Sequence, residues 1–179
     1  MNTIDKINSI MLCDILTHFG VKSEINPKIV KYAIESGNQW ILNAEYSYLL
    51  SDEPSKEVRD FVISVLNMYR GLSAALRKLP TEQQKEIVEK YNLHIAEKHI
   101  QIPGFDGNNE AEYFSVIEAF QEMNKFTEQS KPIANTHSQT IHSYELMLKE
   151  YDRLSAVNRS FELSSDEIST VLSKAPFGI

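Results

Sequence analysis

The chain has little cysteine, glycine, proline or basic charge, and it has no long apolar run. Its single cysteine excludes an intrachain disulfide and any zinc site built from several cysteines. Its 18 basic residues stand against 25 acidic ones, and this net charge of −7 argues against general attraction to nucleic acid or anionic lipid. No run of about 18 apolar residues predicts a membrane span, and no secretory signal is recognised, so we expect a cytoplasmic protein.

The six glycines and six prolines fall mostly between segments with helical apolar periodicity. Proline breaks a helix and glycine closes one, so together they divide the chain into about eight expected helices. The expected helices cover residues 4–19, 27–36, 38–50, 55–79, 81–93, 110–126, 136–157 and 165–175. The stretch 94–103 fits no helix well and is interpreted as a frayed helix end or a short extended connection.

These patterns predict an all-α fold, a single compact multi-helix domain over residues 1–179 with one long central helix near 55–79. Gly71 inside that helix predicts close approach by another helix, and Thr81-x-x-Gln84 and Ser164-x-x-Glu167 predict capping boxes. The first helix places its apolar residues at three-to-four spacing on one expected face: Ile4, Ile7, Ile10, Met11, Ile15 and Phe19. Several faces look wider than one core requires. This excess favours a homo-oligomer, although a multi-layer monomer explains it equally well.

Few residues suggest chemistry. His94 and Glu97, with His99 nearby, would share a helix face if that stretch were helical, and they are weak candidates for metal ligands. We expect an ordinary polar surface there instead, and no cofactor. Cys13 has no basic neighbour in sequence and is expected to be a buried structural thiol.

An early aromatic group comprises Tyr32, Trp40, Tyr46 and Tyr48. Its members could line a partner groove, but helical spacing favours packing in the core. No nucleophile elbow, phosphate-binding loop or dinucleotide glycine fingerprint occurs in the sequence. The common hydrolase and nucleotide chemistries therefore have no support.

One segment carries a resemblance to a known family. Residues Gly104-Phe105-Asp106-Gly107-Asn108-Asn109-Glu110-Ala111-Glu112-Tyr113 resemble the Gly-Phe-Asp-x-x-x-Glu-x-x-Tyr signature of the YfbU family. Four further matches follow the family's order: Ile34-Glu35-Ser36-Gly37, Met68-Tyr69-Arg70-Gly71-Leu72, Tyr144 with Met147 and Leu148, and Leu163-Ser164-Ser165-Asp166-Glu167-Ile168. Where the family's first helix carries Leu-Ser-Asn-Gln, this chain has Leu12-Cys13-Asp14-Ile15. The resemblance implies a helical, oligomer-prone bacterial cytoplasmic protein of unknown biochemical function, and it implies no reaction.

The signature residues Gly104, Phe105, Asp106, Glu110 and Tyr113 form either a structural element or a pocket. We expect Gly104 to allow a turn, Phe105 to enter the core and Asp106 to cap the next helix. Glu110 and Tyr113 would then lie on one helix face, within hydrogen-bond reach of a partner helix.

Three functions remain open. The first is a non-enzymatic homo-oligomeric interaction or regulatory protein. The second is a metal- or small-molecule-dependent enzyme with a site near the signature. The third is a DNA-associated regulator with a helix–turn–helix between residues 4 and 50, which has only Lys22, Lys28 and Lys31 as a positive patch.

Overall fold

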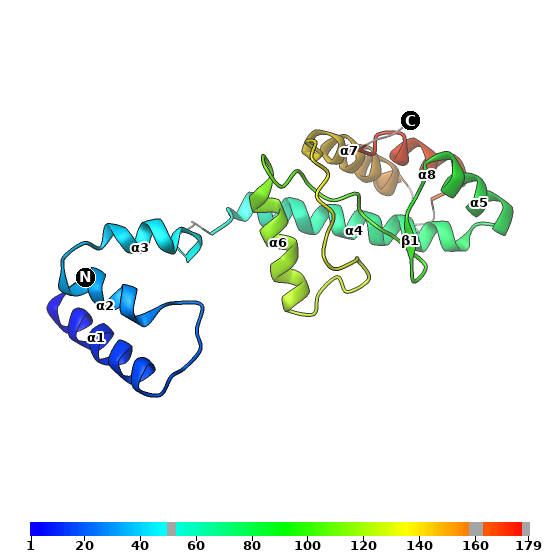
Figure 1. Cartoon of the computed structure of the whole chain (residues 1–179). Coiled ribbons are helices and arrows are strands. Elements are labelled where there is room, and N and C mark those ends of the chain that lie inside the picture. The colour runs from blue at the N-terminus through cyan, green and yellow to red at the C-terminus, as the bar shows by residue number, and fades with distance from the viewer. Residues whose placement is uncertain (50–52, 158–162, 177–179) are drawn as a thin grey trace. The chain divides into compact units, whose positions relative to one another are not determined.

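The structure is a computed structural model that describes residues 1–49, 53–157 and 163–176. The chain forms two compact units, Met1–Glu53 and Pro54–Ile179, called here the N-terminal unit and the C-terminal unit. Each is described by itself (Figure 1).

The N-terminal unit is a small stack of short helices. α1 (Thr3–His18) begins with a capping box between Asn2 and Asp5. α2 (Pro27–Glu35) begins where the side chain of Asn26 accepts a hydrogen bond from the backbone N–H of Lys28. Gly20 and Gly37 follow these two helices with positive φ, as the sequence pattern predicts.

The third expected helix is much shorter than the pattern suggests. α3 (Trp40–Glu45) ends at Tyr46, where the backbone leaves the helical region, and a 3₁₀ turn (Ser47–Leu49) follows. Residue 50 and the start of the expected joint at 51–54 lie outside the described residues.

The expectation that the early aromatic residues pack in the core holds for Tyr46 alone among the side chains described. Tyr46 is buried, whereas Tyr32 and Trp40 are more than half exposed. The side chain of Tyr48 lies outside the description. Helical spacing cannot distinguish these cases because the unit has few layers to bury an aromatic ring.

The C-terminal unit is built around α4 (Lys56–Lys78), which contacts α6 (Ala111–Glu122), α7 (Ile141–Val157) and α8 (Ser165–Leu172) (Figure 1). Ser55 caps its first turn by accepting from the backbone N–H of Val58. α4 supplies more buried residues than any other described helix: Val58, Val62, Val65, Leu66, Met68, Tyr69, Leu72, Ser73, Ala75 and Leu76. The expected long central helix is therefore confirmed.

Gly71 lies where α7 approaches α4. A Cβ atom at this position would stand 2.0 Å from the hydroxyl oxygen of Tyr151. The interpretation of Gly71 as a point of close helix approach is confirmed, since only a residue without a side chain leaves room for the tyrosine in this position.

Two helix starts differ from the sequence prediction, and one agrees. α5 (Thr81–Lys90) has Pro80 at its cap position, and the side chain of Gln84 donates to the carbonyl of Leu79, so the expected Thr81 capping box is wrong. α7 begins at Ile141 and not near residue 136. The Ser164–Glu167 capping box at the start of α8 is present.

The stretch that fits no helix forms a small hairpin of β1 (Ile95–Ala96) and β2 (His99–Ile100). Glu97 and Lys98 form its turn with φ values of +48° and +67°. This pair of left-handed residues suits a two-residue hairpin, although neither is the glycine or asparagine that usually marks such a turn. The alternative of an extended connection is therefore the correct one.

Side chains attach the segment 99–102 to its neighbours. The hydroxyl of Ser73 on α4 accepts from the backbone N–H of Ile100 at 2.9 Å. The amide of Gln129 donates to the carbonyl of Ile100 at 3.2 Å and accepts from the N–H of Ile102 at 2.9 Å. The side chain of Gln101 accepts from the backbone N–H of Ser130 at 2.7 Å. Polar side chains thus bind backbone groups that a neighbouring strand would bind in a larger sheet.

The all-α class is confirmed, with eight α-helices and one two-stranded hairpin in the described parts of the chain. The extent of a single domain over residues 1–179 stays a prediction. None of the helices described has the length and hydropathy that crossing a membrane requires.

The hydroxyl of Ser73 donates to the carbonyl of Tyr69 and accepts from the backbone N–H of Ile100, and this gives a stability prediction. Ser73→Ala leaves the buried N–H of Ile100 without its acceptor, so we expect the free energy of unfolding to fall by about 1–3 kcal/mol in urea denaturation. Ser64→Ala is the matched control, because Ser64 also donates to the carbonyl four residues earlier on α4 but is exposed. Equal losses in the two variants would contradict this role of Ser73.

Candidate functional site

The signature segment connects the hairpin to α6 and lies against the loop that precedes α7. Gly104 has a φ of +110°, and a Cβ atom there would stand 1.9 Å from the carbonyl oxygen of Ala134. Phe105 forms a parallel bridge with Asn135, and its carbonyl accepts from the backbone N–H of Thr136 at 3.0 Å. Gly104 therefore allows both the turn and the close contact of two loops.

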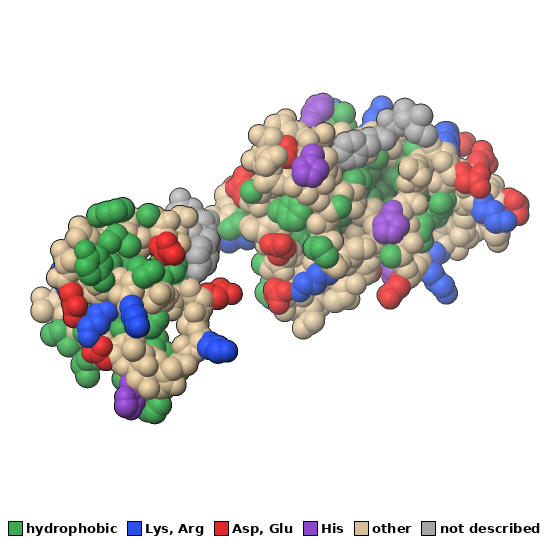
Figure 2. Space-filling view, in the orientation of Figure 1, with side chains coloured by type: hydrophobic (Ala, Val, Ile, Leu, Met, Phe, Trp, Pro, Cys, Tyr) green, Lys and Arg blue, Asp and Glu red, His purple; other side chains and the backbone are tan. Residues whose placement is uncertain are grey.

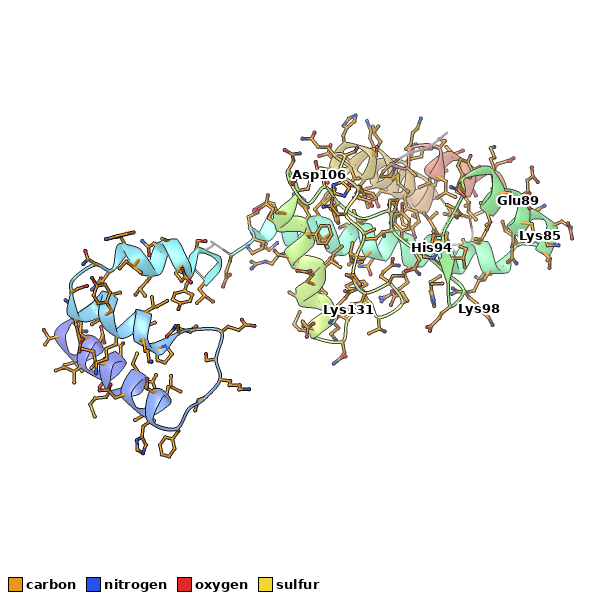
Figure 3. All side chains as sticks on the ribbon, viewed as in Figure 1. Lys85, Glu89, His94, Lys98, Asp106 and Lys131 are labelled. Atoms are coloured by element: carbon orange, nitrogen blue, oxygen red, sulfur yellow. The ribbon has the colours of Figure 1, made fainter. Side chains whose placement is uncertain are left out.

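Asp106, which Figure 3 labels, holds the turn before α6 instead of capping that helix. Its buried carboxylate accepts from the backbone N–H of Asn108 at 3.0 Å and from the side-chain amide of Asn109 at 2.5 Å. These bonds, that of Asn109 foremost, lower the pKa of Asp106 below its ordinary value of 3.8. The expected capping role is wrong, because α6 has Glu110 at its cap position and no side-chain cap.

The buried carboxylate of Glu110 joins the start of α6, the turn at Asp106 and the start of α7. Oε1 accepts from the backbone N–H groups of Thr140 at 2.7 Å and Ile141 at 3.0 Å. Oε2 accepts from the N–H of Asp106 and the hydroxyl of Thr140, both at 2.9 Å. The carboxylate thus lies at the N-terminus of α7, where free backbone donors and the helix dipole favour negative charge. Glu110 does bond the start of another helix, although it stands at the cap position of α6 and does not share a helix face with Tyr113 as expected.

Tyr113 belongs to an aromatic cluster behind this network. Its ring stacks on that of the fully buried Phe105 at 5.5 Å, and the ring of Phe61 meets it edge-on at 5.6 Å. The ring of Tyr144 on α7 contacts Phe105 at 5.3 Å, and its hydroxyl donates to the carbonyl of Gly104 at 2.9 Å. Burial raises the pKa of Tyr113 and, more strongly, that of Tyr144. Phe105 enters the core as predicted.

A shallow pocket of about 280 Å³ borders the signature. It is lined by Asn109, Glu110, Gln139, Ile141, His142 and Glu145. Glu110 lines it and has a carboxylate that already accepts four hydrogen bonds, and the Nδ1 atom of His142 lies 3.6 Å from a carboxylate oxygen of Glu145. The titratable side chains at this pocket therefore already contact other groups of the protein.

Thr140 and Asn135 are the residues of this network that sequence reasoning missed. Thr140 is fully buried and bonds Glu110, while Asn135 accepts from the backbone N–H groups of Gly107 and His137. The signal available in the sequence was weak, a threonine directly before an apolar helical pattern, which is a common capping position.

The weak metal candidates lie at the hairpin, where Figure 3 labels His94 and Lys98. His94 and Glu97 are exposed, and the helix that would have placed them on one face does not form. The Nδ1 atom of His99 is buried without a hydrogen-bond partner in the structure. Among the described residues, no three His, Cys, Asp or Glu side chains are grouped to hold a metal ion.

α1 in the N-terminal unit is apolar on two opposite sides. Ile10, Cys13 and Leu16 lie on the side that packs against α2, with Cys13 buried as predicted. The other side carries Ile4, Ile7, Met11, Ile15 and Phe19, a set called here the apolar stripe. At 100° per residue the centre of the apolar stripe is about 180° from Cys13. The predicted single apolar face is therefore wrong, since Ile10 belongs to the α2 side.

Every member of the apolar stripe exposes half or more of its surface. The N-terminal unit contains 12 of the 15 large apolar residues that are exposed in the described chain, although it has fewer than a third of the residues. Figure 2 shows hydrophobic side chains over much of its surface. Its buried apolar residues are only Cys13, Ala33, Ile34 and Tyr46 among those described.

Comparison with known proteins gives one match. The family model described as the YfbU domain matches residues 2–174, nearly the whole chain. Neither the curated proteins nor the solved structures include a match to this chain.

The role of Glu110 predicts a large effect from a small change. Glu110→Gln replaces one acceptor oxygen by an NH₂ group that faces buried donors. We therefore expect the free energy of unfolding, measured by urea denaturation, to fall by about 2–4 kcal/mol. Glu112→Gln, an exposed change two residues along the chain, is the control and should cost little. A Glu110→Gln protein as stable as the Glu112→Gln protein would refute the capping of α7 by this carboxylate.

Asp106 predicts a pH dependence. Its pKa is lowered in the folded state, so its stabilising effect is complete well above pH 3.8 and is lost as the pH falls through the lower folded value. The difference in unfolding free energy between the wild type and Asp106→Asn should therefore shrink in acid, measured by urea denaturation from pH 7 to pH 3. Asp152→Asn, at an exposed position on α7, serves as the control. A difference that is constant with pH would contradict the ionised hydrogen bonding of Asp106.

Proposed function

The chain belongs to the YfbU family, and we propose that it acts as a non-enzymatic homo-oligomeric interaction or regulatory protein. The observation that carries this proposal is the exposed apolar stripe of α1. The stripe supplies the contact between copies, and the C-terminal unit supplies the stable body of each copy.

The apolar stripe needs a cover. A helix that is apolar on opposite sides is characteristic of a buried helix, and α2 covers only one side of α1. Complete burial of a large apolar side chain stabilises a protein by about 1.5–3 kcal/mol. Covering the five side chains of the apolar stripe, each at least half exposed, would therefore contribute several kcal/mol. A unit of this size with four buried apolar residues has little other stabilisation.

A second copy of α1 fits the apolar stripe by symmetry. In an antiparallel pair with Met11 on the two-fold axis, Ile7 of one copy faces Ile15 of the other, because both lie four residues from Met11. The two helix dipoles then oppose each other favourably.

The contacts of the signature support an interaction role over an enzyme at that place. The carboxylates of Asp106 and Glu110 accept hydrogen bonds from backbone and side-chain donors of the same unit. Their geometry explains the signature through the joining of loops and helices, and it requires no substrate.

The arrangement of charges also argues against a DNA-reading helix in the N-terminal unit. Lys31 lies 2.5 Å from Asp14 and 3.9 Å from Glu35, and hydrogen bonding to Asp14 raises its pKa. α3, the last α-helix of the unit, carries no lysine or arginine. A recognition helix would need basic and amide residues on its outer face.

Native mass spectrometry and light scattering on the full chain test the proposal. We expect a defined oligomer for the wild type and a shift to monomer for Met11→Glu, because a carboxylate at the two-fold axis would be buried beside its own copy. Met123→Glu is a closely matched control, since Met11 and Met123 are each 58% exposed. This control should leave the assembly intact.

Two results would contradict the proposal. One is a wild-type chain that is monomeric at all concentrations, which would mean that the apolar stripe is covered in another way. The other is an oligomer that Met11→Glu leaves unchanged, which would move the interface away from α1.

A further inference from the structure

The N-terminal unit contains a solvent-open cavity of about 360 Å³ beside α2 and α3, and its lining residues Ile25 and Leu49 are exposed. It is lined by Ile25, Val30, Gln39, Leu42, Asn43, Tyr46 and Leu49. No lining residue belongs to α1, so the cavity is independent of the apolar stripe and of the proposed function.

The lining is mostly apolar and contains no charged side chain. The hydroxyl of the buried Tyr46 accepts from the backbone N–H of Asn26 at 2.9 Å, which fixes its ring as one wall. Gln39 and Asn43 lie four residues apart at the start of α3 and therefore share a face of that helix. Their amides supply the polar groups of an otherwise apolar site.

We propose that this cavity binds an uncharged, largely apolar ring compound of one or two rings. The pocket is more than twice as large as the enclosed apolar cavity of about 150 Å³ that holds benzene, and it is open to solvent, so a ring compound can enter it. It also lies within the range of about 300–1,000 Å³ that is usual for small-molecule sites, which combine apolar walls with a few polar groups. A charged ligand would lose part of its hydration against the apolar walls without gaining a counter-charge.

The packing of the unit favours a ligand in this place. The unit has four buried apolar residues among those described, and the cavity walls of Val30 and Leu42 are only partly buried. An apolar ring between α2 and α3 would therefore extend a small core. Binding to the folded state alone would also raise the stability of the unit.

Indole is a suitable probe, because it is an uncharged two-ring compound with one N–H that an amide oxygen can accept. We expect titration of the full ¹⁵N-labelled chain with indole to shift the amide resonances of the cavity residues in a saturable way. Indole-3-acetate, the same ring with a carboxylate, should bind at least about tenfold more weakly, since no lining group balances its charge.

Variants locate the site. Val30→Phe fills the cavity and should abolish the indole shifts, whereas Ala44→Phe adds the same ring at an exposed position of α3 outside the lining and should preserve them. If Val30→Phe does not fold, Asn43→Trp provides a second test, because this exposed position can take a large ring that blocks the opening.

Several outcomes would overturn the proposal. These are no saturable shift with indole, equal binding of indole-3-acetate, shifts confined to α1, or full binding by both Val30→Phe and Asn43→Trp. Cavity resonances that respond to protein concentration and not to indole would show that a second copy fills the cavity, which also refutes a small-molecule site.

Discussion

The C-terminal unit depends on one buried carboxylate. Glu110 sits at the cap position of α6, yet its oxygens accept hydrogen bonds from donors at the start of α7, thirty residues later in the chain. Without this charge the N-terminus of α7 would place free N–H groups in the protein interior, which is costly. The position of α7 in turn determines where Tyr144 meets Phe105 and where Tyr151 lies over Gly71.

The spacing of the family signature follows from this arrangement. Gly104 allows two loops to touch, Phe105 fills the space between the helices, and Asp106 closes the turn that brings Glu110 back to α7. Tyr113 lies one turn further along and stacks on Phe105. Each residue of the pattern thus has a physical reason that concerns the joining of α6 to α7.

The sequence predicted the helix ends well where the capping or terminating residue lies next to the helix. Asn26, Gly37 and the Ser164–Glu167 pair act on their own neighbours, so their effect can be inferred without a fold. The start of α7 was misplaced because its cap comes from Glu110, far away in sequence. The Thr81 box failed for a local reason: the adjacent Pro80 takes the cap position of α5, and Gln84 donates to the carbonyl of Leu79 instead.

The candidate site was predicted only in part. The signature residues do meet, but the position of Thr140 before an apolar helical pattern was only a weak sign that it and Asn135 complete their network. Periodicity also merged two faces of α1 into one. Three-to-four spacing shows that apolar residues lie near one another on a helix. It does not show whether a neighbour such as α2 covers them.

The short hairpin has a consequence for solubility. A lone pair of two-residue strands would ordinarily offer free edges to which a strand of another molecule can add, the first step towards aggregation. Here the outward backbone groups of Ile100 and Ile102 are already bound by Ser73 and Gln129. The side chains of a helix and a loop thereby close the edge at β2, which would otherwise act as a template for another strand.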